Sequence, residues 1–356
     1  MSFSSGRKDM IQKKEEHVPM GTPYERAIRY REYEEQLLRL NTVLRVDHHM
    51  RTPYSIHMSY PTARSLYTLR VYVIRQGLLL SKDFFGEHMI FKMNSRIQEE
   101  TGARDGDIII EALPFTDSHY PSIYKTLQNL EIGHLLYNIG IVAKLYESSY
   151  SVDNRHSGFV LLRQEKKEKD HTNDPGKLEK FWRQAEVRSS GKYYGGLMNF
   201  DADHETYRYI PKGPEGIAAV SFGCIPPDTV KTLLFVNNGQ AYVNEAYQLT
   251  CSYHELTQEY SYVNFRTQSQ IYLILCKAPV NCDNYTEVIQ YMGLLAQEIC
   301  IENAGPMVYN RPVKQVMQTF WRPILQQNIA LGEYIPFYGV LTGKDSVPCA
   351  CYKRVV

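Results

Sequence analysis

The sequence predicts an α+β fold in which two halves of the chain repeat the same set of elements. Two helix patterns, over residues 123–145 and 285–299, are so apolar that they predict central, buried helices. Each follows a short apolar run typical of a buried strand, at 107–113 and at 271–275. A chain of 356 residues, 43% of them hydrophobic, can bury such helices in two domains or in one large domain.

The most polar stretch of the chain separates the two halves. Residues 163–180 are rich in Lys, Glu and Asp and predict an exposed linker. The first residues are also polar and predict a flexible tail. We therefore expect an N-terminal tail over 1–22, a first half over 23–162, the linker over 163–180 and a second half over 181–356.

The first half begins with an amphipathic pattern. Apolar residues recur at helical spacing from Pro23 to Leu44, which predicts one long helix. Residues 69–74 then alternate as in a strand, and the glycine-containing residues 75–106 predict a polar, hairpin-like region. Pro114 ends the strand at 107–113, and a turn over 117–121 leads into the first apolar helix.

The second half contains corresponding elements in a less regular order. Residues 187–196 form a loop rich in Gly and Ser, and Pro226 stands at the start of a helix predicted over 226–234. A last strand is predicted over 334–343. The chain contains no dinucleotide-binding glycine motif, P-loop, zinc-protease motif or nucleophile elbow.

Charge and cysteine content exclude several classes of function. The net charge of +1 gives no electrostatic case for nucleic acid or an anionic membrane as a partner. All seven cysteines lie beyond residue 223 without a CxxC pair, which favours free thiols and gives no support for a metal site. No run approaches the roughly 20 apolar residues of a membrane span, so we expect a cytoplasmic protein.

The turn before the strand at 69–74 is the first candidate for a ligand site. Pro61, Thr62, Ala63 and Ser65 are small or rigid residues that let backbone N–H groups approach a flat or anionic ligand. A turn that merely connects two elements has the same composition. A second candidate is Arg188, because the Ser-Ser-Gly sequence that follows it can form an anion-binding nest.

Several stretches resemble the nitroreductase-like flavoproteins, and within them the streptolysin/microcin-type (SagB-type) azoline dehydrogenases of ribosomal peptide biosynthesis. Tyr60–Val73 resembles the family's Tyr-Pro-Ser-x-Gly-x-Leu-Tyr stretch, and Glu131–Asn138 is similar to its Glu-x-Gly-His helix. Pro336–Lys344 is similar to a C-terminal Pro-x-Tyr motif that ends in Gly-Lys. Arg188–Ser190 resembles the Arg-Arg-Ser flavin loop, and Met292–Gln297 resembles a repeat of the helix.

The resemblance implies a fold, a cofactor and a set of site residues. The fold would comprise two tandem nitroreductase-like halves, a pseudo-dimer, each with a mixed or antiparallel sheet packed on a central buried helix. FMN would be bound by Pro61, Thr62, Ala63, Arg64, Ser65, Arg188, Ser190 and Lys344. His119 and Tyr120 stand where the family has a catalytic Lys-Tyr pair. The implied partners are a peptide precursor as substrate, a cyclodehydratase, and a second copy of the chain in a homodimer.

The expected reaction is dehydrogenation of an azoline ring to an azole. It removes a hydride, which flavin accepts, and a proton, which needs a base such as Tyr120 or His119. Two alternatives remain open. One is a flavin enzyme that performs a different oxidation or reduction on a peptide or small molecule, and the other is a flavin-free scaffold that binds a partner. Glu131 and His134 would be costly to bury unpaired, so we expect them to contact a ligand or other side chains.

Overall fold

The computed structural model describes most of the chain between residues 20 and 354. It covers residues 20–25, 28–46, 56–114, 120, 122–190, 211, 219–223, 225–226, 228–239, 241–259, 268–277, 284–305, 308–314, 318–344 and 353–354. For Arg64 and Lys344 it describes the backbone only.

The first sheet has eight strands in the order β1-β6-β5-β4-β7-β9-β8-β10; β10 comes from the second half of the chain and the other strands come from residues 21–166. Its strands are antiparallel to their neighbours, except that β10 runs parallel to β8. Their bounds are Gly21–Pro23 (β1), Leu69–Arg75 (β4), Leu78–Lys82 (β5), His88–Met93 (β6), Ile108–Ala112 (β7), Ser149–Asp153 (β8), Phe159–Lys166 (β9) and Val220–Phe222 (β10). Helix α2 (Ser95–Thr101) joins β6 to β7, and helix α3 (Tyr124–Leu145) joins β7 to β8.

The second half builds a six-stranded antiparallel sheet with the order β13-β12-β11-β14-β16-β15. The strands are Val230–Asn237 (β11), Ala241–Asn244 (β12), Leu249–Ser252 (β13), Gln268–Lys277 (β14), Val308–Val313 (β15) and Tyr334–Lys344 (β16). Helix α5 (Tyr253–Glu259) precedes β14, and helix α6 (Tyr285–Glu302) joins β14 to β15. This order repeats β6-β5-β4-β7-β9-β8 of the first sheet, strand for strand.

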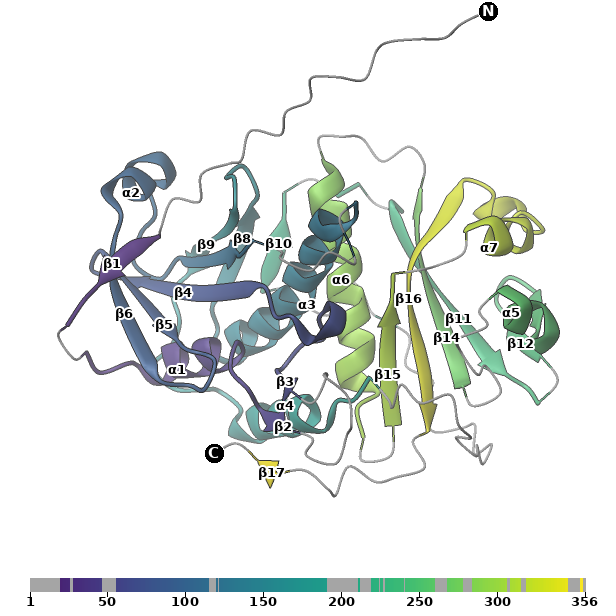
Figure 1. Cartoon of the computed structure of the whole chain (residues 1–356), viewed down its shortest axis with the longest axis horizontal. Coiled ribbons are helices and arrows are strands. Elements are labelled where there is room, and N and C mark those ends of the chain that lie inside the picture. The colour runs from purple at the N-terminus through teal and green to yellow at the C-terminus, as the bar shows by residue number, and fades with distance from the viewer. Residues whose placement is uncertain are drawn as a thin grey trace, which may run out of the picture.

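Helices α3 and α6 lie side by side between the two sheets (Figure 1). Glycines allow their backbones to touch: a Cβ on Gly133 would collide with the carbonyl oxygen of Gln290, and a Cβ on Gly293 would collide with that of Leu130. The contact is reciprocal: Gly293 stands 160 residues after Gly133, and Gln290 stands 160 residues after Leu130. Both helices are buried along most of their length, which confirms the central position predicted from their apolar patterns.

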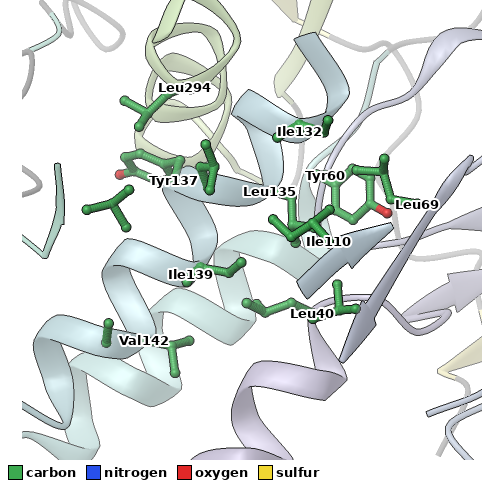
Figure 2. Packing of buried hydrophobic residues seen from close by; sticks show 14 of the residues in the cluster. Leu40, Tyr60, Leu69, Ile110, Ile132, Leu135, Tyr137, Ile139, Val142 and Leu294 are labelled. Carbon is green, nitrogen blue, oxygen red and sulfur yellow. The ribbon is translucent and has the colours of Figure 1, made fainter. Parts of the chain in front are cut away.

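The main hydrophobic core fills the space around these two helices. Figure 2 shows Tyr60 among Leu69, Ile110 and Leu135, so the segment before β4 packs directly on α3. On the other side of α3, Tyr137 lies beside Leu294 of α6. Two smaller cores cover the outer faces of the sheets. Among the described helices, none combines the length and the apolar character that crossing a bilayer requires.

Shorter elements complete the structure. Helices α1 (Glu32–Arg39) and α4 (Pro175–Val187) pack against the α3 and α6 pair, and α7 (Gln318–Leu325) packs against the second sheet. A three-stranded sheet combines β2 (Arg45–Val46), β3 (Ile56–His57) and β17 (Lys353–Arg354) from the two ends of the chain. Two 3₁₀ helices, η1 (Ala63–Ser65) and η6 (Ile329–Leu331), lie in connections.

Three predicted elements differ from the structure. The helix expected from Pro23 to Leu44 is only α1, which begins after a capping box between Arg31 and Glu34. The helix expected over 226–234 is wrong: β11 occupies 230–237, and its inward side chains alternate with period two. The polar linker expected over 163–180 contains the end of β9 and the start of α4, whose exposed charged faces explain its composition.

Candidate functional site

The segment before β4, here called the Pro61 turn (residues 61–68), contacts the N-terminal half of α3. It contains η1 and two non-glycine residues in the left-handed region, Ser65 with φ 54° and Tyr67 with φ 45°. Such backbone costs about 1–3 kcal/mol per residue and persists only where surrounding contacts enforce it. The Tyr67 hydroxyl makes one such contact, donating to the Ile56 carbonyl (3.0 Å) and accepting from the Met58 N–H (3.1 Å).

Glu131 on α3 holds the C-terminal end of the turn. Its carboxyl oxygens accept hydrogen bonds from the Thr68 N–H (3.0 Å) and the Thr68 hydroxyl (2.9 Å). The side chain is buried, and burial raises its pKa from 4.5 to about 7, although hydroxyls of Thr68 and Thr62 favour the charged form. The carboxyl group of Glu131 therefore ionises less readily than a solvent-exposed one.

His134, one helical turn further along α3, holds the N-terminal end. Its Nδ1–H donates to the Pro61 carbonyl oxygen at 3.0 Å, because a carbonyl can only accept. Burial lowers its pKa to about 3, so the ring is neutral and Nε2 is left as an acceptor. The Tyr338 hydroxyl of β16 donates to this nitrogen at 3.2 Å. One imidazole thus joins the Pro61 turn, α3 and the second sheet.

Arg188, directly after α4, carries a buried guanidinium beside this arrangement. Its side chain is 1% exposed, and its Nη2 donates to the Met58 carbonyl at 3.2 Å. Its Nε and Nη1 have no hydrogen-bond partner among the described residues. Burial lowers the pKa of Arg188, with smaller opposing contributions from Tyr67 and Cys300. Among the described residues no carboxylate pairs with this buried cation, and a buried cation is costly to leave unpaired, so the geometry suits an anion.

Three more buried side chains have polar atoms without a described partner: Gln297 on α6, Asn310 on β15 and Gln270 on β14. The Gln297 amide donates to the Ser59 carbonyl at 2.9 Å, next to the carbonyl that Arg188 contacts, and its Oε1 is unpaired among the described residues. Asn310 of β15 accepts from Thr342 at 2.8 Å, which leaves its Nδ2 unpaired in the same part of the chain. Gln270 of β14 accepts from Tyr272 at 3.0 Å and likewise leaves its Nε2 without a described partner.

These orphaned atoms fit the polar end of a flavin mononucleotide. Three of the four side chains, Arg188, Asn310 and Gln270, offer unpaired N–H donors, which suit a phosphate or its ribityl oxygens. All four side chains are buried, so such donors would be costly to leave unsatisfied. The residues present therefore fit the anionic cofactor that the sequence suggests.

The structure brings two of the predicted groups of site residues together. Pro61 and Arg188 lie on either side of the same cluster, through His134 and Met58. Ser190 lies at the edge of the second sheet, where its carbonyl accepts from Arg311 Nε at 2.9 Å, and the backbone of Lys344 pairs with Val308 at the end of β16. Thr62, Ala63, Arg64 and Ser65 belong to the turn itself.

The predicted catalytic pair is placed only in part. Tyr120 is half-buried just before α3, and its carbonyl accepts from the Ile123 N–H at 3.3 Å. His119 lies outside the described residues. Sequence reasoning did not assign a role to Tyr338, although it stands in the Pro336–Lys344 stretch. The polar residues Gln270 and Asn310 gave no signal, because each is a single amide within an ordinary strand pattern.

Comparison with known proteins identifies the fold. The chain superposes on a crystal structure of a provisionally assigned nitroreductase from Anabaena variabilis with a TM-score of 0.59 and 14% sequence identity. The match covers 88% of each chain, so it includes elements of both sheets. The sequence matches no protein-family model and no curated protein. The protein therefore has a nitroreductase-like α+β fold.

Proposed function

We propose that this protein is an FMN-dependent oxidoreductase built as a nitroreductase-like pseudo-dimer in one chain. Support comes from the repeated strand order of the two sheets and from the reciprocal contact of Gly133 and Gly293. A likeness that covers 88% of the Anabaena protein points the same way. Flavoproteins of this type form their site where two units meet, and the Pro61 turn and Arg188 come from different halves.

The observation that carries the proposal is the buried guanidinium of Arg188. Its Nε and Nη1 groups, which have no described partner, would provide charge-assisted donors for a phosphate, and its contact with the Met58 carbonyl brings it to the segment that leads into the Pro61 turn. Ser190 and Lys344 would add donors at the same end of β15 and β16. Bound FMN would supply a two-electron acceptor for a hydride.

The reaction we propose is oxidation of an azoline ring to an azole in a ribosomally made peptide. A base would remove a proton from one ring carbon, and the second hydrogen would be transferred as a hydride to the oxidised cofactor. Tyr120 is the proposed base, and the neighbouring His119 is the alternative base. The peptide precursor, a cyclodehydratase partner and homodimer formation are parts of the same proposal, supported by the resemblance of Tyr60–Val73 and Glu131–Asn138.

Cofactor titration of matched arginine variants tests the proposal. Arg188→Met should weaken FMN binding at least a hundredfold, because the phosphate loses a buried cation. Arg183→Met is the control: this arginine lies on the exposed face of α4, paired with Glu179, and its loss should leave the affinity unchanged. Wild-type protein without flavin absorbance or FMN affinity would reject an oxidoreductase and favour a scaffold that binds a partner.

The catalytic assignment needs a separate measurement. Tyr120→Phe should bind FMN like the wild type but oxidise an azoline peptide at least a hundredfold more slowly, because the base is lost. Tyr124→Phe, on the first turn of α3, is the matched control. Equal rates for Tyr120→Phe and the wild type would remove Tyr120 from the mechanism.

A further inference from the structure

The N-terminal half of α3 holds the Pro61 turn at both of its ends. His134 contacts the Pro61 carbonyl, and Glu131, three residues earlier, contacts the backbone N–H and hydroxyl of Thr68. The spacing of three places both side chains on one face of the helix. Between these two points the turn passes through the left-handed conformations of Ser65 and Tyr67.

A turn of this shape requires external contacts. Serine and tyrosine have no preference for positive φ, so both conformations persist only where surrounding contacts enforce them. The hydrogen bonds from α3 are made to buried groups, since Glu131 is 4% exposed and His134 is 3% exposed. They are therefore shielded from competition with water.

We propose that Glu131 and His134 are positioning residues that hold the Pro61 turn in the shape that receives the flavin. Neither residue needs to touch the cofactor: Glu131 is occupied by Thr68, and both ring nitrogens of His134 are occupied by Pro61 and Tyr338. Their effect is to fix the backbone that contacts it. This inference rests on the proposed function, but its structural part can be measured without a cofactor.

Tyr338 extends the arrangement to the second sheet. The Pro61 carbonyl fixes the ring proton on Nδ1, because a carbonyl can only accept, and Nε2 is then free to accept from the Tyr338 hydroxyl. The tyrosine therefore adds a second hydrogen bond to the tautomer that the turn requires. Strand β16 therefore has two roles in the proposed site. Lys344 at its end is a proposed cofactor contact, and Tyr338 within it orients His134 and, through His134, the Pro61 turn.

Two isosteric variants of His134 separate its contacts. In His134→Asn, the amide nitrogen can occupy the place of Nδ1 and still donate to Pro61. In His134→Gln, the side-chain amide reaches the place of Nε2 and can still accept from Tyr338, but the contact with Pro61 is lost. We expect FMN affinity within about threefold of the wild type for His134→Asn and a loss of tenfold or more for His134→Gln.

Hydrogen exchange in the protein without cofactor provides the second readout. Glu131→Val should speed exchange of the Thr68 amide at least tenfold, measured relative to amides of α6, whereas Glu131→Gln keeps an acceptor for that amide and should restore slow exchange. Tyr137→Phe is the matched control, since it removes a hydrogen bond from α3 to Glu302, away from the turn. It should leave both readouts unchanged.

The wild-type protein should also show a local titration. The Thr68 amide shift should change with an apparent midpoint near pH 7 as Glu131 ionises, and this change should be absent in Glu131→Gln. The titratable groups that face Glu131 are Tyr60, Tyr67 and Tyr338, and the cluster also contains His134 and Arg188. Burial raises the pKa of the three tyrosines and lowers the pKa of His134 and of Arg188. The expected midpoint near pH 7 therefore belongs to Glu131.

Each outcome decides between the two proposals. Equal FMN affinity in wild type, His134→Gln and Glu131→Val would overturn the positioning role, as would unchanged Thr68 exchange in Glu131→Val. Equal losses in His134→Asn and His134→Gln would also overturn it, because the Pro61 contact would then not matter. If Glu131→Val speeds Thr68 exchange but the wild-type protein binds no FMN, the positioning of the turn by α3 would stand and only the proposed flavin function would be rejected.

Discussion

The two central helices share a backbone arrangement but differ in the chemistry of their equivalent residues. Adding 160 to Glu131 and His134 of α3 gives Tyr291 and Leu294 of α6. Tyr291 packs edge-on against Phe222, with ring centroids 5.9 Å apart, and Leu294 lies in the main core. The glycines that set the helix contact are present in both helices, whereas the polar residues that hold a turn are present in one.

The connections before the equivalent strands β4 and β11 differ in the same way. The Pro61 turn is bonded to α3 at both ends, whereas before β11 the Thr229 hydroxyl donates to the carbonyl of Pro226, three residues away in the same connection. Arg188 follows α4 directly, and the residue that follows α1 is Leu40. In the described residues, the halves therefore share glycine and apolar residues at equivalent helix positions, whereas the polar residues that hold a turn lie on α3.

The shared feature should give the largest effect when it is broken. Gly133→Ala or Gly293→Ala would force the backbones of α3 and α6 apart, and each should lower the free energy of unfolding by about 3 kcal/mol or more. Denaturant unfolding measures this. Gly176→Ala, in the first turn of α4 where a Cβ has room, should cost nothing; a similar loss there would remove the helix contact as the explanation.

The ionisation of Glu131, which has no counterpart at Tyr291, should make the free energy of unfolding depend on pH. Its folded pKa of about 7 lies above its ordinary 4.5, so the folded state binds the proton more tightly. The resulting stabilisation is present below about pH 4.5 and is lost as the pH rises to about 7, by about 3 kcal/mol at 1.36 kcal/mol per pH unit. Unfolding of wild type and Glu131→Gln between pH 4.5 and 8 measures it; parallel stability curves would contradict it.

Exchanging the unequal residues tests the difference directly. His134→Leu leaves the Pro61 carbonyl and the Tyr338 hydroxyl without partners, and Leu294→His buries an imidazole among apolar side chains. Each should cost about 2 kcal/mol, by unsatisfied groups in the first case and by desolvation in the second. Thermal or denaturant unfolding of the two variants measures these losses. A neutral Leu294→His would mean that the α6 position tolerates the polar chemistry of α3.

The smallest effect concerns the strained turn. Ser65→Gly should stabilise the fold by up to about 0.5 kcal/mol, because glycine adopts φ 54° without strain but loses more chain entropy on folding. Asp228→Gly, at φ 62° in the connection before β11, is the matched variant and should gain less, since aspartate tolerates this region better. Unfolding in urea measures both, and a clear loss in Ser65→Gly would show that the serine side chain matters more than the backbone.

Sequence patterns could predict the elements but not the contacts between the halves. The apolar runs gave α3, α6, β7 and β14 because burial on all sides leaves a continuous signal. β11 was missed because proline followed by mixed polar and apolar residues suits both a helix start and a half-buried strand. Arg188 gave only a weak signal, since its burial and its place near Met58 depend on residues 130 positions earlier.

The number of FMN molecules bound per chain tests the central claim most directly. Equilibrium dialysis of the full chain against FMN should saturate at one molecule per chain, with loss of that site in Arg188→Met. One site is expected because the Pro61 turn, α3, Arg188 and β16 meet once, while the equivalent place carries Tyr291, Leu294 and Leu40. Saturation at two molecules, or no binding at all, would contradict a single composite flavin site.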